Sequence, residues 1–343
     1  MNGPLDPDER DAYILRKIEG SIARYPKILF KDPADAMAKE LGIGDPVEKM
    51  EVEPWLLPAP PASMQFMLTV ENFVSFIDSN GCLEYADQIK KLVKAGLPAI
   101  PVIFGVDHSL TGGAIRAAAE EHGGGNLRLV VFDSHFDFIL PSIRCGLIQY
   151  DLETNKDTKF SAGDPFIFNR PDSYNADSFL DFIKKEVPPE NIWIVGVSDY
   201  PPREAEEIGD DRVRRYVDFY KGTVESGVHL IKKEDVRSRG AEIKAMLSKT
   251  DKPYTYVSID VDVCANTSLR GARFLDYHGL SHSDLYGLAA AMGKSLEKSK
   301  LAGLDFMEFD VFKAGTTISG TLDRTYPIMA EVYRKIIGHD WSR

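Results

Sequence analysis

The sequence predicts an α/β protein: a single three-layer α/β/α domain with a mostly parallel sheet, preceded by an N-terminal extension. From residue 64 onward, short apolar runs typical of buried strands alternate with longer segments of helical periodicity. Strands that alternate with helices form parallel sheets whose two faces are covered by the helices. Polar motifs rich in aspartate and histidine follow three of the apolar runs. We assign residues 1–62 to the extension and residues 63–343 to the domain.

The individual elements follow from periodicity and from helix-breaking residues. A first helix is expected over residues 8–23, and the LPAPPA sequence of residues 57–62 favours a rigid, extended connector. Ser281 and Ser283 are candidate N-caps of a long helix. The expected strands are 64–70, 99–104, 127–132, 192–197, 254–259 and 301–308, and the expected helices are 84–95, 111–122, 177–187, 235–248, 281–298 and 322–338.

Composition narrows the class of protein. The 343 residues carry a formal net charge of −12, which argues against a nucleic-acid binder, because such proteins usually present a basic face. Cys82, Cys145 and Cys264 are too few for a disulfide framework and favour a reducing compartment. The N-terminus is polar and acidic, and no apolar run is long enough for a membrane span. We therefore expect a cytoplasmic protein that binds neither nucleic acid nor membrane.

Three short motifs carry the chemistry. Gly105-Val-Asp-His-Ser109, Asp133-Ser-His-Phe-Asp137 and Ser258-Ile-Asp-Val-Asp262 each lie at or just after a predicted strand. Ligands of open α/β sheets bind beyond the carboxyl ends of the strands, so these motifs should meet at one edge. Asp107 is expected to support the ligands rather than to bind metal. The candidate metal ligands are His108, Asp133, His135, Asp137, Asp260 and Asp262.

These residue types fit a pair of divalent ions. Carboxylates and neutral imidazoles suit Mn²⁺, Fe²⁺, Ni²⁺ or Zn²⁺. Four carboxylates carry four negative charges, which two divalent ions neutralise, whereas one ion would leave buried charge uncompensated. A two-metal site can activate water for hydrolysis near neutral pH. Asp-His-Ser or Asp-x-Asp alone is more typical of a turn or a helix cap, and Asp-x-His-x-Asp alone fits a metal site about equally well. The occurrence of all three after predicted strands favours a metal site.

The motifs, in this order, resemble those of the ureohydrolase family of arginase, agmatinase and formimidoylglutamase. The family patterns Gly-Gly-Asp-His-Ser, Asp-Ala-His-x-Asp and Ser-x-Asp-x-Asp are similar to the three segments, with Val106 in place of the second glycine. Residues 278–285 are similar to the family's Gly-Gly-Leu-Thr helix start, and residues 303–308 to its strand ending in glutamate. The resemblance covers residues 98–338 and implies an arginase-like fold.

The resemblance also implies roles for single residues. In the family, metal-activated water attacks the carbon of a guanidino or amidino group. Asp137 would handle the proton of that water, and Glu308 would pair with the substrate guanidinium. We expect two Mn²⁺ ions, with Ni²⁺, Fe²⁺ or Co²⁺ as alternatives, and a homo-oligomer, either a trimer or a hexamer. The first ion would be held by His108, Asp133, Asp137 and Asp260, and the second by Asp133, His135, Asp260 and Asp262, so that Asp133 and Asp260 bridge.

Several segments that border the site in the family differ here. The family's proton-shuttling histidine is replaced by Ala162 or, in another alignment, by Cys145. Ala265-Asn266 stands where the family has Asp-Pro, and residues 196–199 replace its Gly-x-Arg. Arg270 and Arg273 follow the third motif and are either carboxylate-binding residues or solvated surface arginines. No matched residue supports recognition of agmatine or free arginine.

The leading hypothesis is a binuclear-metal hydrolase that cleaves a C–N bond of a guanidino or formimino group. Three substrate types remain open: a formimidoylglutamate-type anion, a small guanidino compound such as agmatine, and an arginine side chain in a peptide. The alternative is a non-catalytic relative that keeps the metal as a scaffold or regulator. A metallophosphatase is disfavoured, because it would need asparagine ligands and basic residues facing a phosphate.

Overall fold

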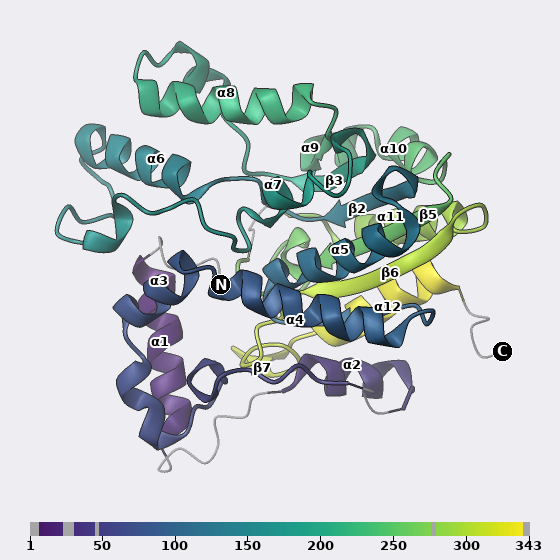
Figure 1. Cartoon of the computed structure of the whole chain (residues 1–343), viewed down its shortest axis with the longest axis horizontal. Helices are drawn as coiled ribbons and strands as arrows, with labels where there is room; N and C mark the ends of the chain where they lie inside the picture. The colour runs from purple at the N-terminus through teal and green to yellow at the C-terminus, as the bar shows by residue number, and fades with distance from the viewer. Residues whose placement is uncertain (1–6, 23–30, 45–47, 276–278, 339–343) are drawn as a thin grey trace.

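A parallel six-stranded sheet forms the centre of the molecule (Figure 1). The structure, a computed structural model, describes residues 7–22, 31–44, 48–275 and 279–338. The strand order is β1-β6-β5-β2-β3-β4, and each neighbouring pair is parallel, which confirms the expected sheet. The strands are β1 (Val102–Phe104), β2 (Leu127–Phe132), β3 (Ile192–Val197), β4 (His229–Lys232), β5 (Tyr254–Asp260) and β6 (Lys300–Met307).

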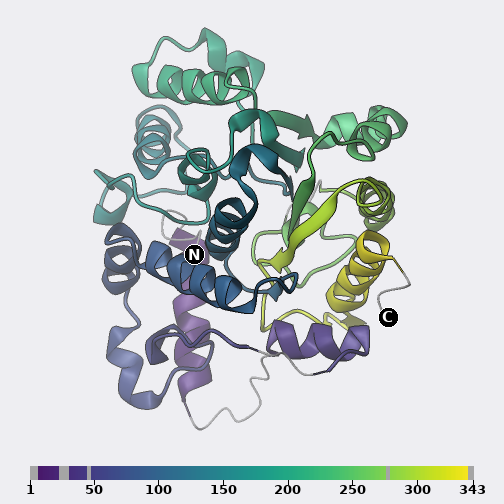
Figure 2. The same ribbon diagram turned by 45° about the vertical axis from the view of Figure 1, so that its right-hand side comes forward.

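Helices cover both faces of the sheet, as the sequence predicted (Figure 2). Successive side chains of a strand point to opposite faces. Val130 and Phe132 of β2 therefore pack in one core, and Leu129 and Val131 pack in the other. The first core lies under α2 (Pro33–Leu41), α9 (Lys233–Ser238), α10 (Gly240–Leu247), α11 (His282–Ser295) and α12 (Thr325–Ile337), and the second under α4 (Gly81–Gly96), α5 (Thr111–His122) and α7 (Phe179–Ile183).

Most predicted strands are confirmed, with two differences. β1 begins at Val102 rather than at residue 99, and Pro101, just before it, lacks the N–H that a ladder needs. β4 was not predicted; its four residues pair at the edge of the sheet and are only partly buried.

The strand predicted at 64–70 is wrong. These residues form the 3₁₀ helix η2 (Ala62–Met67) and the start of α3 (Val70–Asp78). Thr69 caps α3, since its side chain accepts the backbone N–H of Asn72 at 3.2 Å. Periodicity cannot distinguish a strand from a helix in short apolar runs. Here the N-cap at Thr69 begins a helix.

The helix predictions hold with further differences. The segment expected at 235–248 is divided into α9 and α10 at Arg239, whose φ of −124° is not helical. Ser281 is the N-cap of α11 and forms a capping box with Asp284. Further elements that were not predicted include α2, α6 (Pro141–Thr154), α8 (Asp211–Glu225), the hairpin of β7 (Thr317–Ile318) and β8 (Thr321–Leu322), and the 3₁₀ turns η4 (Gly124–Asn126), η5 (Pro165–Ile167), η6 (Pro189–Asn191), η7 (Arg203–Glu207) and η8 (Val261–Val263).

The N-terminal extension is in two parts. The expected first helix is α1 (Pro7–Ser21), whereas Ala23 lies outside the described residues. α1 packs with η1 (Pro54–Leu56), η2 and α3 beyond the carboxyl ends of the strands, and α2 packs beside α12 (Figures 1 and 2). Ile14, Trp55 and Phe73 share one apolar cluster. The boundary expected at residue 62 stays a prediction.

The described helices were also compared with the requirements of a bilayer. None of the helices over residues 7–22, 31–44, 48–275 and 279–338 is long and apolar enough to cross a membrane.

Candidate metal centre

The predicted ligands and Glu308 meet at the carboxyl ends of four neighbouring strands. His108 begins η3 (His108–Leu110) shortly after β1, and Asp133 follows β2 directly. Asp260 ends β5, and Glu308 follows β6. Because β1, β6, β5 and β2 are adjacent, these ends share one edge of the sheet. We call the six residues the carboxylate cluster: His108, Asp133, His135, Asp137, Asp260 and Asp262.

Three carboxylates surround the His108 ring. Its Nδ1 lies 2.9 Å from an oxygen of Asp137 and 3.1 Å from oxygens of both Asp133 and Asp260. All four residues are buried. Ligand atoms of His108, Asp133 and Asp137 lie within 4.8 Å of one another, which is close enough to hold one metal ion.

A second group lies around His135. Its Nδ1 is 3.2 Å from Asp262 Oδ2 and 3.6 Å from Asp133 Oδ1. Asp133 thus belongs to both groups, as a bridging ligand must. Asp260 approaches the first group through His108, and its expected contact with a second ion stays a prediction.

Buried polar atoms without hydrogen-bond partners point into this cluster. They are Nδ1 of His108, Oδ2 of Asp133, both carboxylate oxygens of Asp137, and Oδ2 of Asp262. Such groups destabilise a protein interior unless something compensates them. Oxygen and imidazole nitrogen atoms are ligands for divalent metals, so the residues fit the ions that the motifs predict.

A hydrogen-bonded chain orients the His108 ring. Ser258 Oγ donates to Asp305 Oδ1 at 2.6 Å and therefore accepts from His108 Nε2, 2.9 Å away. Tyr256 donates to the other Asp305 oxygen at 2.7 Å. The proton on Nε2 leaves Nδ1 free to act as a ligand. The sequence analysis assigned these three residues no role, although Ser258 alternates with Asp260 on β5 and pairs in register with Asp305 on β6.

The cluster shifts the protonation of its members strongly. Burial raises the pKa of Asp137 and Asp260 well above the usual range, and neighbouring carboxylates add to the effect. Burial also opposes ionisation of Asp133, but contacts with His108 and His135 outweigh it and lower the pKa of Asp133. Burial lowers the pKa of His108, but the surrounding aspartates raise it well above its ordinary value. Protons therefore compensate the negative charge where no cation does, and metal binding would release them.

Asp137 and Glu308 have unusual backbone conformations. Their φ angles are 52° and 62°, in the left-handed region that residues other than glycine rarely adopt. Strained conformations of this kind concentrate at functional sites. The backbone N–H of Leu180 donates to the carbonyl of Asp137 at 3.1 Å, which helps to hold that conformation.

Glu308 lies beside the cluster and contacts none of its ring or carboxylate atoms by hydrogen bond. It is completely buried, and its Oε1 accepts the backbone N–H of His108 at 2.8 Å. Its Oε2 has no hydrogen-bond partner and lies 3.6 Å from Nη1 of Arg273. A cationic group therefore already approaches the carboxylate that was predicted to bind the substrate cation.

The two arginines after the third motif differ. Arg270 is exposed, whereas the Arg273 side chain is only 13% exposed and donates to the Val106 carbonyl at 3.1 Å. The Arg273 guanidinium lies over the rings of Tyr13 and Phe274, 5.0 and 5.4 Å from their centroids. Arg270 fits the solvated alternative, whereas Arg273 is largely buried and oriented toward the carboxylate of Glu308.

The other predicted segments border the site in different ways. Asp107 caps the turn that carries His108, accepting the backbone N–H and the hydroxyl of Ser109. Cys145 packs in a separate apolar cluster, and burial raises the pKa of its thiol, so it is a poor proton shuttle. Ala162 lies in an exposed turn. Of the segment 278–285, His278 lies outside the described residues.

Asp199 belongs to the segment that differs from the family pattern, and it lies near His135 of the carboxylate cluster. Burial raises its pKa to about 7, and the charge of His135 counteracts part of the shift. One of its oxygens is buried without a hydrogen-bond partner. A carboxyl that titrates near neutral pH is suited to general acid–base chemistry. The sequence offered no signal for it beyond its position two residues after β3.

A sequence model described as "Arginase family" matches residues 69–337. The chain belongs to the arginase family. The match begins at the cap of α3 and includes the whole carboxylate cluster and Glu308. It begins about thirty residues before the start of the resemblance inferred from the motifs, and α1 and α2 lie outside it.

Solved structures agree with this fold at low sequence identity. Proclavaminate amidino hydrolase of Streptomyces clavuligerus has a TM-score of 0.51 and 21% identity, covering 74% of this chain and 68% of its own. Bacillus caldovelox arginase has a TM-score of 0.51 and 14% identity, covering 78% and 77%. A Trypanosoma cruzi formiminoglutamase variant with Mn²⁺ has a TM-score of 0.50 and 14% identity, covering 74% and 69%. A comparison with curated proteins finds no match.

Proposed function

We propose that this protein is a metal-dependent hydrolase that cleaves a C–N bond of a guanidino or formimino group and releases urea or formamide. The observation that carries the proposal is the convergence of five buried nitrogen and oxygen atoms without hydrogen bonds at the strand ends, beside the buried carboxylate of Glu308. Buried carboxylates of this kind need compensation by protons or by cations, and the cluster is therefore suited to bind divalent ions.

The proposed ligands are those that the motifs predicted. His108, Asp133, Asp137 and Asp260 hold one divalent ion, and Asp133, His135, Asp260 and Asp262 hold the other. When bound, the two metal ions would supply the Lewis-acid chemistry that activates water, and Mn²⁺ is the ion we expect. The orientation of the His108 ring by Ser258 supports this assignment, because it directs Nδ1 into the cluster.

The protein's own groups then bind the substrate and move the proton. Asp137 carries two oxygens without hydrogen-bond partners and is proposed to accept a proton from water and pass it to the leaving amine. Glu308 Oε2 is proposed to receive the substrate cation through a charge-assisted hydrogen bond. That cation must share the carboxylate with Arg273 or displace it, since the two already lie 3.6 Å apart.

A product-resolved screen tests this function. The Mn²⁺-loaded protein is incubated with arginine, agmatine, guanidino acids, formimidoylglutamate and an arginine-containing peptide, and urea, formamide and ammonia are measured. Urea identifies a guanidino substrate and formamide a formimino substrate. No release from any compound, in a sample that carries its metal, would contradict the proposal for these substrate types and would favour a non-catalytic role.

We also propose that the protein is a homo-oligomer, a trimer or a hexamer, in the cytoplasm. The resemblance to ureohydrolases motivates the assembly. Light scattering at micromolar concentration measures the mass directly, and a monomer of 38.2 kDa would contradict it.

A further inference from the structure

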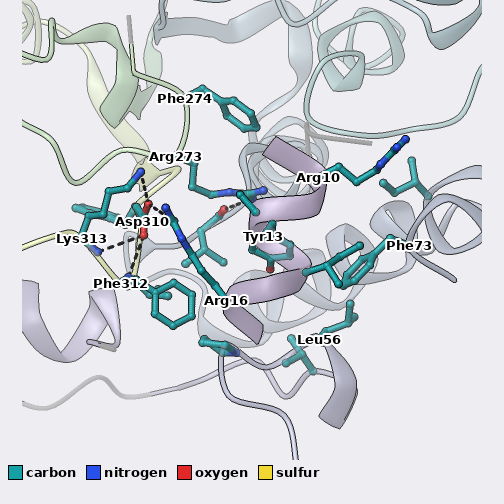
Figure 3. Close-up of a pocket in the computed structure, with 18 residues that line it drawn as sticks. Arg10, Tyr13, Arg16, Leu56, Phe73, Arg273, Phe274, Asp310, Phe312 and Lys313 are labelled. Carbon is teal, nitrogen blue, oxygen red and sulfur yellow. Dashed lines mark hydrogen bonds and ion pairs between the residues drawn. The ribbon is translucent and has the colours of Figure 1, made fainter. Parts of the chain in front are cut away.

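A cavity of about 280 Å³ lies between α1 and the segment that follows β6 (Figure 3). Its volume is just below the usual range of ligand pockets, about 300–1,000 Å³. We call it the α1 pocket. Its walls are formed by α1, by residues 273 and 274, and by residues 309–313.

The α1 pocket shares a wall with the metal centre. Arg273 lines it and reaches Glu308, and Phe309 lines it directly after Glu308. Phe274 lines it as well, and its ring is edge-on to His135 with 6.3 Å between centroids. A ligand in the pocket would thus be separated from the metal centre by single side chains.

The lining of the α1 pocket holds more cationic than anionic side chains, and each of these cations also pairs with a carboxylate. Four cationic side chains line it, and Asp310 is its one lining carboxylate among the described residues. Asp310 is itself shared, at 3.2 Å from Arg16 and 2.9 Å from Lys313 (Figure 3). The lining cations are Arg10, Arg16, Arg273 and Lys313.

Two further contacts show how the positive charge is arranged. Arg10 pairs with Asp164 at 2.8 Å, away from Asp310. Lys17, completely buried on the same helix, donates to the carbonyls of Leu56 and Leu57. Burial lowers the pKa of Lys17 to about 7, and the charge of Arg273 adds to the shift.

The rest of the wall is apolar and includes both aromatic and aliphatic side chains. Tyr13 lies between Arg273 and Phe73, and its ring meets that of Phe73 with centroids 5.8 Å apart (Figure 3). Ile14 and Phe312 add to the same surface. A pocket with this lining favours a ligand that has an apolar body and a negative charge, because each part then meets its complement.

We propose that the α1 pocket binds a small organic anion with an apolar body, such as a carboxylate on an aryl or branched alkyl group. This ligand is either the part of the substrate remote from the hydrolysed group or a separate effector of the same chemistry. Binding of this ligand can be measured without turnover, so the test of the α1 pocket is independent of the test of the proposed function.

Two probes of matched shape and opposite charge test the proposal by calorimetry on the whole protein. They are 4-phenylbutyrate and 4-phenylbutylamine, which share the ring and the chain. We expect the acid to bind at least about tenfold more tightly than the amine, since complementary charge adds a charge-assisted contact. Equal binding of both, tighter binding of the amine, or no binding of the acid would overturn the proposal.

Variants locate the binding. Ala12→Trp fills the exposed rim of the pocket without a change of charge and should weaken acid binding by about tenfold or more. Arg16→Gln and Lys313→Gln remove cations from opposite walls, and each should weaken it by about threefold to tenfold. Lys313→Gln changes no residue of α1, so weaker acid binding in this variant would result from the lost charge and not from disturbed packing of the helix.

The matched control is Arg214→Gln, an exposed arginine on α8 that also pairs with an aspartate. It should bind the acid as the unmodified protein does. If all pocket variants bind like this control, the acid binds elsewhere and the proposal is wrong. Competitive inhibition of the activity found in the screen identifies the occupant as part of the substrate, and non-competitive inhibition identifies an effector; either result supports an anion site.

Discussion

The metal centre and the α1 pocket lie side by side but differ in charge and in support. The metal centre consists of buried carboxylates and imidazoles on the ends of core strands. The α1 pocket is lined by apolar side chains and by four cationic ones, and one of its walls is a helix outside the part of the chain that matches the family. We infer that the family fold determines the chemistry at the metal centre, whereas the α1 pocket determines which ligand binds.

The largest effect is expected from removing a ligand shared by both ions. Asp133→Ala should lower metal content from about two ions per chain to below one and abolish turnover. His108→Ala should lose less metal, because Asp133 belongs to both ligand groups and His108 to one. Elemental analysis after Mn²⁺ loading measures this difference. If the unmodified, folded protein holds one ion or none, the binuclear assignment is wrong.

Measuring acid binding to the α1 pocket of the same variant tests whether the two regions are separate sites. Asp133→Ala should bind 4-phenylbutyrate as before, since the α1 pocket includes none of the cluster residues. A loss of both metal and acid binding would mean that the two regions are one site.

Glu308→Gln separates substrate binding from metal binding. It keeps the shape and an acceptor for the His108 N–H but removes the buried charge. It should weaken transition-state binding by about 2–5 kcal/mol, which lowers kcat/KM about 30-fold to several thousand-fold. Metal content should not change, because Glu308 is not a proposed ligand.

Steady-state kinetics on the substrate from the screen measures the effect, and Glu331→Gln on the surface of α12 serves as the control. If Glu308→Gln strips the metal, the ligand assignment is wrong. If kcat/KM is unchanged, Glu308 is not the partner of the substrate cation.

Ser258→Ala tests whether the orientation of His108 matters. Without the hydroxyl, His108 Nε2 loses its acceptor, and Asp305 loses one donor. Removing such a supporting group typically lowers metal affinity about 10–100-fold. Competition with a chelating dye measures the affinity, and Ser283→Ala, exposed on α11, is the control. Equal affinities would show that the ring is held by packing alone.

The sequence predicted that the candidate ligands lie at neighbouring strand ends, but it did not predict the α1 pocket, and the difference has a physical reason. The ligands occupy strand ends, and buried strands such as Leu127–Phe132 are apolar enough to be located residue by residue. The parallel sheet then brings His108 and Asp260 together without any knowledge of loops. The two unusual backbone angles, at Asp137 and Glu308, leave no trace in the residue types.

The pocket depends instead on contacts between distant segments. Arg16 and Asp310 are 294 residues apart and meet only because α1 packs beyond the sheet edge. No periodicity encodes that docking, and the strand predicted at 64–70 obscured the segment against which α1 packs. For the same reason the sequence could not decide between the two interpretations of Arg273, which depend on its contact with Glu308.

The last predicted effect concerns the stability of the pocket wall at different pH values. Lys17 has a pKa lowered from 10.5 to about 7 by burial and by Arg273, so between these values the unfolded chain binds more protons than the folded one. Its contribution to stability therefore rises with pH from about 7 toward 10.5. Between pH 6.5 and 9 the unfolding free energy should rise by about 2–3 kcal/mol relative to Lys17→Met, which carries no titrating group. Urea denaturation at both pH values measures this difference, with Lys39→Met, exposed on α2, as the control. A difference that stays constant would mean that Lys17 keeps its proton in the fold and that α1 docks as a fully charged helix.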